Sequence, residues 1–234
     1  MKVAAISDLH GILPLYPSDY WKDLNDCEIL FICGDILPLN IQFNMVESKR
    51  WLIEEFKLWA YDLPVEKIYL IAGNHDAWFE RNDMLAHSIF SKYDKATYLN
   101  NEYVDYISTQ DSKRYRIFGT PYCHIFGNWP FMRDENTLAS KFAQIPENVD
   151  ILMTHDAPYG TSDICLEGWA ADGRHKGCPE LRDAIIEKKP KWNVKGHLHS
   201  TNREIEILGE TKVVSCSILD ESYRLIYDPQ IIKL

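Results

Sequence analysis

Five short stretches of the sequence combine turn residues with side chains that can bind a metal ion or move a proton. They are Asp8-Leu9-His10, Gly34-Asp35, Gly73-Asn74-His75-Asp76, Thr154-His155 and Gly196-His197-Leu198-His199. Any one of them is compatible with an ordinary polar turn. Together they offer carboxylate, amide and imidazole donors without thiolate, a set that suits Mn²⁺, Fe or Zn²⁺ better than a closed structural zinc site.

These donors are too numerous for one metal ion. The candidate ligands are Asp8, His10, Asp35, Asn74, His155, His197 and His199, with His75 left over. One ion takes roughly four to six ligands, so the set predicts two ions about 3.5–4 Å apart, as in hydrolases that hold both the attacking and the leaving oxygen. Two dications, balanced by two carboxylates and a bridging hydroxide, keep a net positive charge that attracts a phosphate anion.

Each ligand-bearing stretch follows a segment that reads as a strand. Most of these segments are apolar runs typical of buried strands. They cover residues 3–6, 28–33, 68–72, 149–153 and 192–195. Apolar residues at helical spacing over 47–63 predict a crossover helix and hence parallel strands. The carboxyl ends of such strands border the crevice where open α/β sheets bind ligands. Asp8 and His10, two residues apart, are expected to point to one side of an extended chain.

Other local signals predict further elements. Pro179 marks the start of a helix, Asn136 is expected to cap another, and Asp76 is expected to cap a helix that begins at Ala77. Residues 204–208, 212–218 and 223–227 predict three antiparallel strands.

Length and composition predict a globular protein with a single domain, residues 1–234. The net charge of −10 and the lack of a Lys/Arg run argue against a dedicated duplex nucleic-acid surface. No run reaches the roughly 18 apolar residues of a membrane span, and Asp8 and His10 interrupt any signal peptide. The six cysteines are scattered without a C-x-x-C pair. These features predict a cytoplasmic protein.

The five stretches, in this order, resemble the signature of the calcineurin-like metallophosphoesterases. The resemblance implies an α/β fold, a four-layer α/β/β/α double β-sandwich. It implies one metal ion on Asp8, His10 and His199. It implies a second ion on Asn74, His155 and His197, with Asp35 bridging. His75 would not bind metal but would donate a proton to the leaving oxygen or hold the phosphate.

Finer features are similar to the subgroup of metallophosphoesterase-domain-containing proteins. They are Gly119-Thr120-Pro121-Tyr122 and Thr154-His155-Asp156-Ala157-Pro158, although the pattern commonly has Gly where Asp156 stands. The Gly-Asp-x-x-Asp-Arg-Gly motif of serine/threonine phosphatases is incomplete after Asp35, which weakens a protein-phosphatase interpretation.

Four residues outside the ligand set are candidate substrate contacts: Asp76, Arg81, His124 and His175. Each also has a simpler interpretation, as a helix cap or a surface side chain. The aromatic residues Tyr122, Phe126, Trp129 and Phe131 are interpreted as packing residues rather than a stacking platform. The loops 122–131 and 159–177 could still enclose a small ligand.

The sequence thus predicts an enzyme, a dinuclear metal-dependent phosphoester hydrolase that uses a metal-bridging hydroxide, with Mn²⁺ expected and Fe or Zn²⁺ as alternatives. The favoured substrate is a small phosphodiester such as a cyclic nucleotide. A phosphomonoesterase or a nuclease of the same family is the alternative. The last alternative is a non-catalytic binding scaffold. Such a scaffold would be expected to have lost metal ligands or the catalytic histidine, which is His75 in this sequence.

Overall fold

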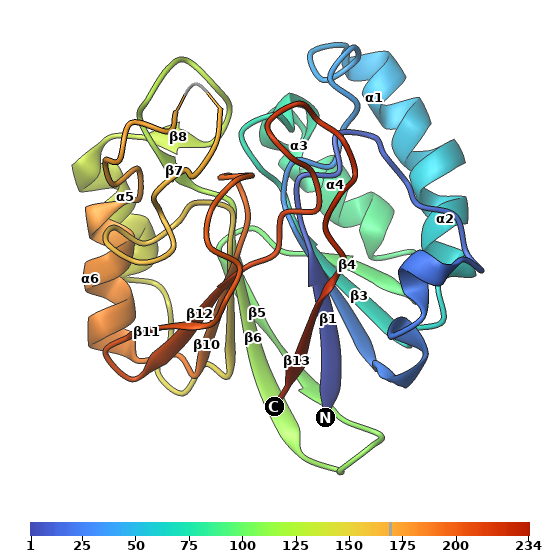
Figure 1. The fold of residues 1–234 in the computed structure, drawn as a ribbon. Coiled ribbons are helices and arrows are strands. Elements are labelled where there is room, and N and C mark those ends of the chain that lie inside the picture. Colours follow the sequence, from blue (N-terminus) through green and yellow to red (C-terminus); the bar gives the residue numbers. More distant parts are fainter. Residues whose placement is uncertain (169) are drawn as a thin grey trace.

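Two β-sheets form the centre of the protein, and helices cover their outer sides (Figure 1). The structure, a computed structural model, describes residues 1–168 and 170–234. The first sheet has the order β13-β1-β2-β3-β4. Its strands are β1 (Lys2–Ile6), β2 (Ile29–Cys33), β3 (Lys67–Ile71), β4 (Ala96–Tyr98) and β13 (Gln230–Lys233). Strands β1 to β4 are parallel, as the crossover helix predicts, and β13 runs antiparallel to β1.

The second sheet has six strands in the order β11-β12-β10-β9-β6-β5. They are β5 (Glu102–Ile107), β6 (Arg114–Thr120), β9 (Ile151–Thr154), β10 (Trp192–Lys195), β11 (Glu206–Leu208) and β12 (Thr211–Ser215). The four central strands are parallel and the two edge strands are antiparallel to their neighbours. A small parallel pair, β7 (Cys123–His124) and β8 (Met132–Arg133), lies in the predicted aromatic loop.

The helices follow the chain in two groups, one beside each sheet (Figure 1). The first group is α1 (Met45–Trp51), α2 (Lys57–Asp62), α3 (Ala77–Arg81) and α4 (Asp83–Phe90), and the second is α5 (Glu135–Phe142) and α6 (Pro179–Lys188). Two short 3₁₀ turns cover Asp19–Trp21 and Leu24–Asp26. The predicted helix over 47–63 is present, but its middle turn, Leu52–Phe56, is a π-helix between α1 and α2.

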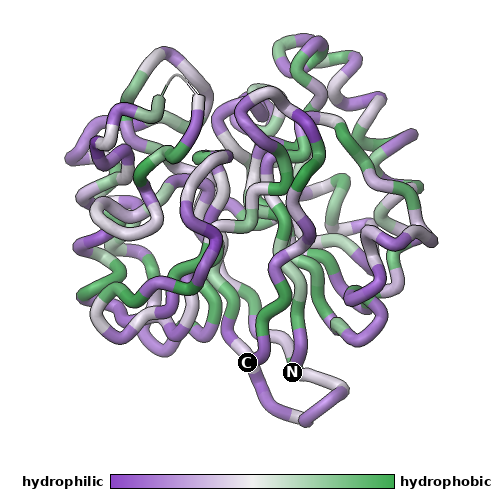
Figure 2. Tube along the Cα trace, viewed as in Figure 1, coloured by the Kyte–Doolittle hydropathy of each residue, from purple (hydrophilic) through white to green (hydrophobic). Residues whose placement is uncertain are grey.

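The core is divided by the alternation of side chains along the strands. In β1, Val3 and Ala5 join a cluster that also contains Ile151 and Val194 of the second sheet. Ala4 and the other residues of the opposite face join a cluster with the helices. The cluster that contains Val3 and Ala5 therefore fills the space between the two sheets, which is consistent with the predicted α/β/β/α layers. The α/β fold is confirmed. Figure 2 shows the strands as mostly hydrophobic and the outer loops as mostly hydrophilic.

Two kinds of local prediction are wrong. The segment 223–227 is not a strand, and the last strand is instead β13, which pairs with β1 in the first sheet. The other two predicted strands are present as β11 and β12, which pair antiparallel as predicted, and β12 also joins β10 in parallel. The residue that caps α5 is Asp134, not Asn136, because Asp134 Oδ1 accepts the backbone N–H of Thr137. Among the described residues, no helix is long and apolar enough to cross a membrane.

Candidate metal centre

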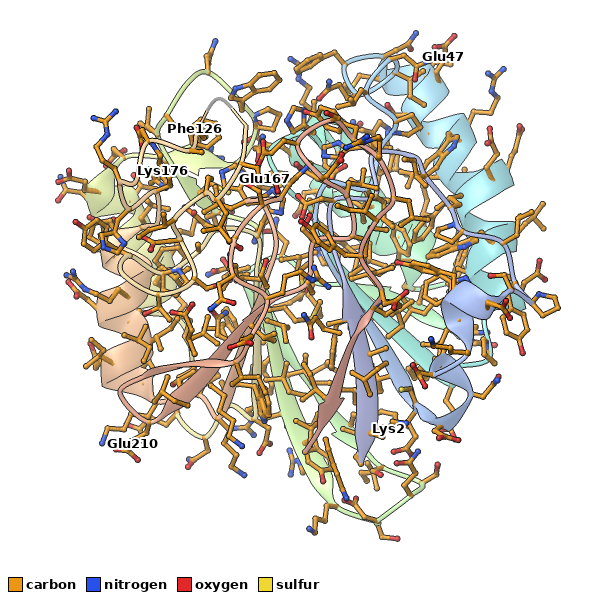
Figure 3. All side chains as sticks on the ribbon, viewed as in Figure 1. Lys2, Glu47, Phe126, Glu167, Lys176 and Glu210 are labelled. Carbon is orange, nitrogen blue, oxygen red and sulfur yellow. The ribbon has the colours of Figure 1, made fainter. Side chains whose placement is uncertain are left out.

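The five ligand-bearing stretches meet at one end of the two sheets. Asp8, Asp35 and Asn74 follow β1, β2 and β3 of the first sheet, while His155 and His197 follow β9 and β10 of the second. Figure 3 shows loops that carry Phe126 and Glu167 at this end, while Lys2 and Glu210 lie at the opposite end. The parallel direction of these strands therefore places all five stretches in one site, as predicted.

Several candidate metal ligands stand in a left-handed backbone conformation. The φ angles are 58° at Asp8, 44° at His10, 53° at Asp35 and 71° at His197. The prediction that Asp8 and His10 share a side because the chain is extended is therefore wrong in its reason, since both residues lie in a tight turn. The turn after β2 also depends on Gly34, where φ is 94° and a Cβ would strike the imidazole of His155.

The first group of ligand atoms comes from Asp8, His10 and His199. One donor atom of each lies within 4.8 Å of the others, and all three side chains are buried. Nε2 of His199 is 3.5 Å from Oδ1 of Asp8. The structure therefore brings together the three residues that the resemblance assigns to the first ion.

The second group contains Asp8, Asp35 and His155, also within 4.8 Å of one another. Nε2 of His155 is 3.3 Å from Oδ2 of Asp35 and 3.0 Å from Oδ1 of Asn74. The ring of His197 lies beside that of His155, with 5.1 Å between the centroids. Asp35 belongs to the second group, but its Oδ2 is also 3.7 Å from Nε2 of His10 in the first. That position suits a bridging ligand.

Backbone carbonyls turn two of the histidines toward the carboxylates. Nδ1 of His155 donates to the carbonyl of Cys33 at 2.8 Å, and Nδ1 of His199 to that of Asp220 at 3.0 Å. Such partners fix the tautomer and leave Nε2 for a metal ion. Burial alone would lower the pKa of His155 and His199, but Asp35 and Asp8 raise it to about 10 and about 9, respectively. Each of these imidazoles thus faces a carboxylate that favours a cation between them.

The donor set fits divalent metal ions. Both ring nitrogens of His10 are buried without a hydrogen-bond partner among the described residues, which is costly unless a group such as an ion takes the lone pair. Burial lowers the pKa of His10 to about 4, so this imidazole is neutral and able to bind metal at neutral pH. Burial would raise the pKa of Asp35, but His155 and His75 hold it well below its usual range.

His75 lies next to the ligand cluster rather than inside it. Its backbone N–H donates to Oδ1 of Asp35 at 2.7 Å, and its ring centroid is 5.1 Å from that of His10. Nδ1 is 2.8 Å from Oε1 of Gln42, whose Nε2 donates to the carbonyl of Leu39 at 3.1 Å. Since Gln42 presents its oxygen, Nδ1 of His75 carries a proton. Sequence reasoning missed Gln42 because it lies seven residues after Asp35 in a loop without a pattern.

Two of the aromatic residues interpreted as packing are at the site. Phe126 is 46 % exposed, and its ring centroid is 5.0 Å from that of His197. The ring of Trp129 is 4.6 Å from that of His75. Tyr122 and Phe131 are buried, which confirms the packing interpretation for them, while Phe126 and Trp129 pack against the rings of His197 and His75.

Asp76 is fully buried and serves the backbone of the site. Its carboxylate accepts the N–H groups of Ile36 and Leu37 after Asp35, and that of Gly73 before Asn74. Burial and the charge of Asp35 raise the pKa of Asp76 to about 7. The prediction that its side chain caps α3 is wrong, because it makes no capping hydrogen bond there.

The other three candidate substrate contacts lie farther out. Arg81 is exposed at the end of α3. Nδ1 of His124 is 2.7 Å from Oδ2 of Asp156, and His124 lines a cavity of about 380 Å³ next to the starts of α5 and α6. His175 is exposed, with Nδ1 2.7 Å from Oδ1 of Asp163. For these residues a contact with substrate stays a prediction.

Comparison with known families agrees with the geometry. Residues 1–201 match the family described as calcineurin-like phosphoesterase, and this range contains every ligand residue described above. The chain belongs to the calcineurin-like phosphoesterase family. The predicted family is thus confirmed, and with it the prediction of an enzyme that hydrolyses phosphoester bonds. The family is typically dependent on two metal ions, in line with the two ligand groups here.

The chain is also similar to curated proteins. The chain is similar to a UPF0046 protein of Caenorhabditis elegans, with 27 % identity over all of this chain and 81 % of that protein. It is also similar to metallophosphoesterase domain-containing protein 1 of Homo sapiens, with 30 % identity over 88 % of this chain. The match spans 64 % of the human protein's length.

Solved structures have the same calcineurin-like fold at low sequence identity. The phosphopantetheinyl hydrolase of Mycobacterium tuberculosis aligns with a TM-score of 0.59 and 15 % identity, over 99 % of this chain and 95 % of that one. A protein of Thermus thermophilus aligns with a TM-score of 0.58 and 14 % identity, over 92 % of this chain and 88 % of that one. These likenesses establish the fold.

Proposed function

We propose that this phosphoesterase is a phosphodiesterase acting on a small substrate such as a cyclic nucleotide, with two divalent ions, expected to be Mn²⁺. The observation that carries the proposal is the pair of buried ligand groups that share Asp8, with His75 beside them. Two ions held there would lower the pKa of a water molecule between them to supply an attacking hydroxide, and would neutralise charge on the phosphoryl oxygens.

The protein's own groups then orient and complete the reaction. Asp8 and Asp35 supply the negative charge that retains the ions, and Asp35 also fixes the backbone of His75. Because Gln42 occupies Nδ1–H of His75, Nε2 is the nitrogen left to face the leaving oxygen, and it donates a proton to that oxygen when the ring enters the reaction as the imidazolium. No residue of the chain needs to form a covalent phosphoryl intermediate in this scheme.

Charge favours a diester over a monoester. Among the described residues, the ligand carboxylates Asp8 and Asp35 form side-chain ion pairs with histidines alone, not with Arg or Lys. Two dications, two carboxylates and a hydroxide leave about one positive charge, which a diester monoanion neutralises. A monoester dianion exceeds this charge by one, and an excess charge in a buried site is costly unless a further cation, such as protonated His75, offsets it. The exposed ring of Phe126 is available to the organic part of such an ester.

The scaffold alternative is disfavoured by the site itself. All seven ligand residues lie at one end of the sheets, and His75 keeps the hydrogen bonds that position it. The free, buried cysteines of the described chain suit a reducing compartment, so we propose the cytoplasm as the place of action.

A panel of substrates tests the proposal. The Mn²⁺-loaded protein is assayed with p-nitrophenyl phosphate, bis-p-nitrophenyl phosphate, 2′,3′- and 3′,5′-cyclic nucleotides and single-stranded DNA. We expect a diester to give the highest kcat/KM and the variant His75→Ala to lose most of that activity. If the monoester exceeds every diester tenfold or more in kcat/KM, the protein is a phosphomonoesterase. If nothing is cleaved, the scaffold alternative stands.

A further inference from the structure

Tyr223 lies against the first ligand group although it follows the last ligand by more than twenty residues. Its ring centroid is 4.9 Å from that of His10 and 5.4 Å from that of His199, and its plane is nearly perpendicular to both, at 82° and 85°. The residue is nevertheless 40 % exposed. Part of the ring thus packs on the metal ligands while part remains accessible to a bound molecule.

The backbone of Tyr223 is held in an uncommon conformation. Its φ of 59° lies in the left-handed region, which a bulky side chain rarely adopts. Such a conformation persists where neighbouring groups over-determine it, and it is found disproportionately at binding and active sites. The position of this ring is therefore fixed by the turn that carries it.

Asp220 is the residue that fixes this turn. Its backbone carbonyl accepts the N–H of Tyr223 at 2.9 Å. Its Oδ1 accepts the backbone N–H groups of Ser222 and Arg224 at 2.9 and 2.8 Å, and its Oδ2 accepts Nε of Arg224 at 2.7 Å. The exposed ring is thus prearranged before any ligand arrives, which reduces the entropic cost of contacting one.

The same residue also orients a metal ligand. The carbonyl of Asp220 accepts the hydrogen bond from Nδ1 of His199. One short segment therefore sets both the ligand nitrogen and the ring beside it. A phosphoester held by the ligand cluster would place its organic group within reach of that ring, on the side of His10 and His199, while Phe126 stands beside His197.

We infer that Tyr223 is a specificity-determining residue, whose ring packs against the organic group of the phosphoester while the ligand cluster holds the phosphoryl group. The inference rests on the proposed function, because it assumes a phosphoester as substrate. Contact of one aromatic ring with another changes affinity by about three- to tenfold. The hydroxyl group is not required for this contact, so phenylalanine should replace tyrosine without loss.

Binding of two small anions separates this contact from metal binding. Phenylphosphonate, which has an aromatic group and is not hydrolysed, and inorganic phosphate are titrated into the Mn²⁺-loaded protein by calorimetry. For Tyr223→Ala we expect the Kd of phenylphosphonate to rise about three- to tenfold, with the Kd of phosphate changed less than about twofold. Tyr223→Phe should bind both anions as the wild type does. Metal content is measured in every sample.

Several results would overturn the inference. They are an equal loss of affinity for both anions, no change for either, or a Tyr223→Phe protein that behaves like Tyr223→Ala. Tyr223→Leu replaces Tyr223→Ala if the latter does not fold, and Tyr103→Ala, which removes a ring that is 53 % exposed on β5, is the matched control. Failure of the proposed function can be distinguished from failure of this inference. In that case the wild-type protein would bind these anions but cleave none of the esters in the substrate panel.

Discussion

Oε1 of Gln42 lies 2.8 Å from Nδ1 of His75, so a neutral amide, not a carboxylate, positions the histidine beside the ligand cluster. The amide is itself oriented by its hydrogen bond to the carbonyl of Leu39 and is nearly fully buried. Gln42 therefore holds the ring in one tautomer without adding negative charge next to Asp35.

Replacement of Gln42 should affect turnover rather than binding. We expect Gln42→Ala to lower kcat about fivefold, the worth of roughly 1 kcal/mol from one lost hydrogen bond, with KM and metal content unchanged. Gln42→Glu keeps an acceptor at the same place and should retain more activity than Gln42→Ala. Steady-state kinetics and metal analysis measure both. A Gln42→Ala protein with a raised KM and normal kcat would contradict a positioning role.

His75 should be separable from the metal ligands. His75→Ala is expected to keep both ions while kcat falls by about 10²–10⁴, the usual contribution of a positioned general acid. The control is His87→Ala, because His87 lies on α4 and pairs with Asp83 and Glu102 outside the site. Release of metal from His75→Ala would show that the residue has been assigned to the wrong role.

Asp35 should be needed for metal retention. Asp35→Asn keeps an oxygen that can accept the N–H of His75 but removes the negative charge between the two ligand groups. We expect the Mn²⁺-loaded and desalted variant to lose at least one ion per chain, together with its activity. Elemental analysis measures this loss. Asp183→Asn, which changes an exposed carboxylate on α6, is the control. Full metal occupancy in Asp35→Asn would argue against a bridging carboxylate.

Glu28 should make stability depend on pH. Its buried carboxylate accepts hydrogen bonds from Ser108 Oγ at 2.6 Å and from Thr109 Oγ1 at 2.6 Å, which ties the β5–β6 hairpin to the start of β2. Burial would raise the pKa of Glu28, but these hydrogen bonds lower it below its usual value. Because the pKa of Glu28 is lower in the folded than in the unfolded state, its carboxylate stabilises the folded protein at pH values above its pKa in the unfolded state, roughly 4. This stabilisation is lost as the pH falls through the pKa of Glu28 in the folded state.

The comparison of wild type with Glu28→Gln tests that dependence. We expect urea unfolding at pH 7 to show a loss of about 1–3 kcal/mol in the variant, since buried hydrogen bonds to a charged group are broken. The difference should shrink as the pH falls below roughly 4, because the wild type then loses the same charge. Glu54→Gln, an exposed change on the first helical segment, should have little effect. A difference that is independent of pH would contradict this role.

The strands that carry the candidate ligands could be predicted from the sequence because they depend on local signals. An apolar run followed by Gly34-Asp35 or Gly73-Asn74 indicates the end of a strand, and this signal does not depend on the rest of the sequence. The parallel pairing that unites them follows from the crossover helix. Neither inference needs knowledge of how distant loops pack.

The residues that sequence reasoning missed or assigned to another role act across long distances in the chain. Asp76 serves the amides of Ile36 and Leu37, about forty residues earlier, so the local rule for helix caps assigned it wrongly. Asp220 meets His199 only because the chain returns to the site before β13. The segment 223–227 has the composition of a strand, but its turn is set by the carboxylate of Asp220.

The left-handed backbone at Asp8, His10, Asp35 and His197 implies a trade-off between stability and function. Each such residue costs of the order of 1–3 kcal/mol, and glycine would adopt the same angles without that cost. A glycine in place of His10 would also remove a buried imidazole that lacks partners among the described residues. The substitution would thus relieve backbone strain while it destroys the metal site and leaves a cavity beside His75, His199 and Tyr223. This end of the molecule therefore contains strained backbone and unpartnered polar atoms that a sequence chosen for stability alone would avoid.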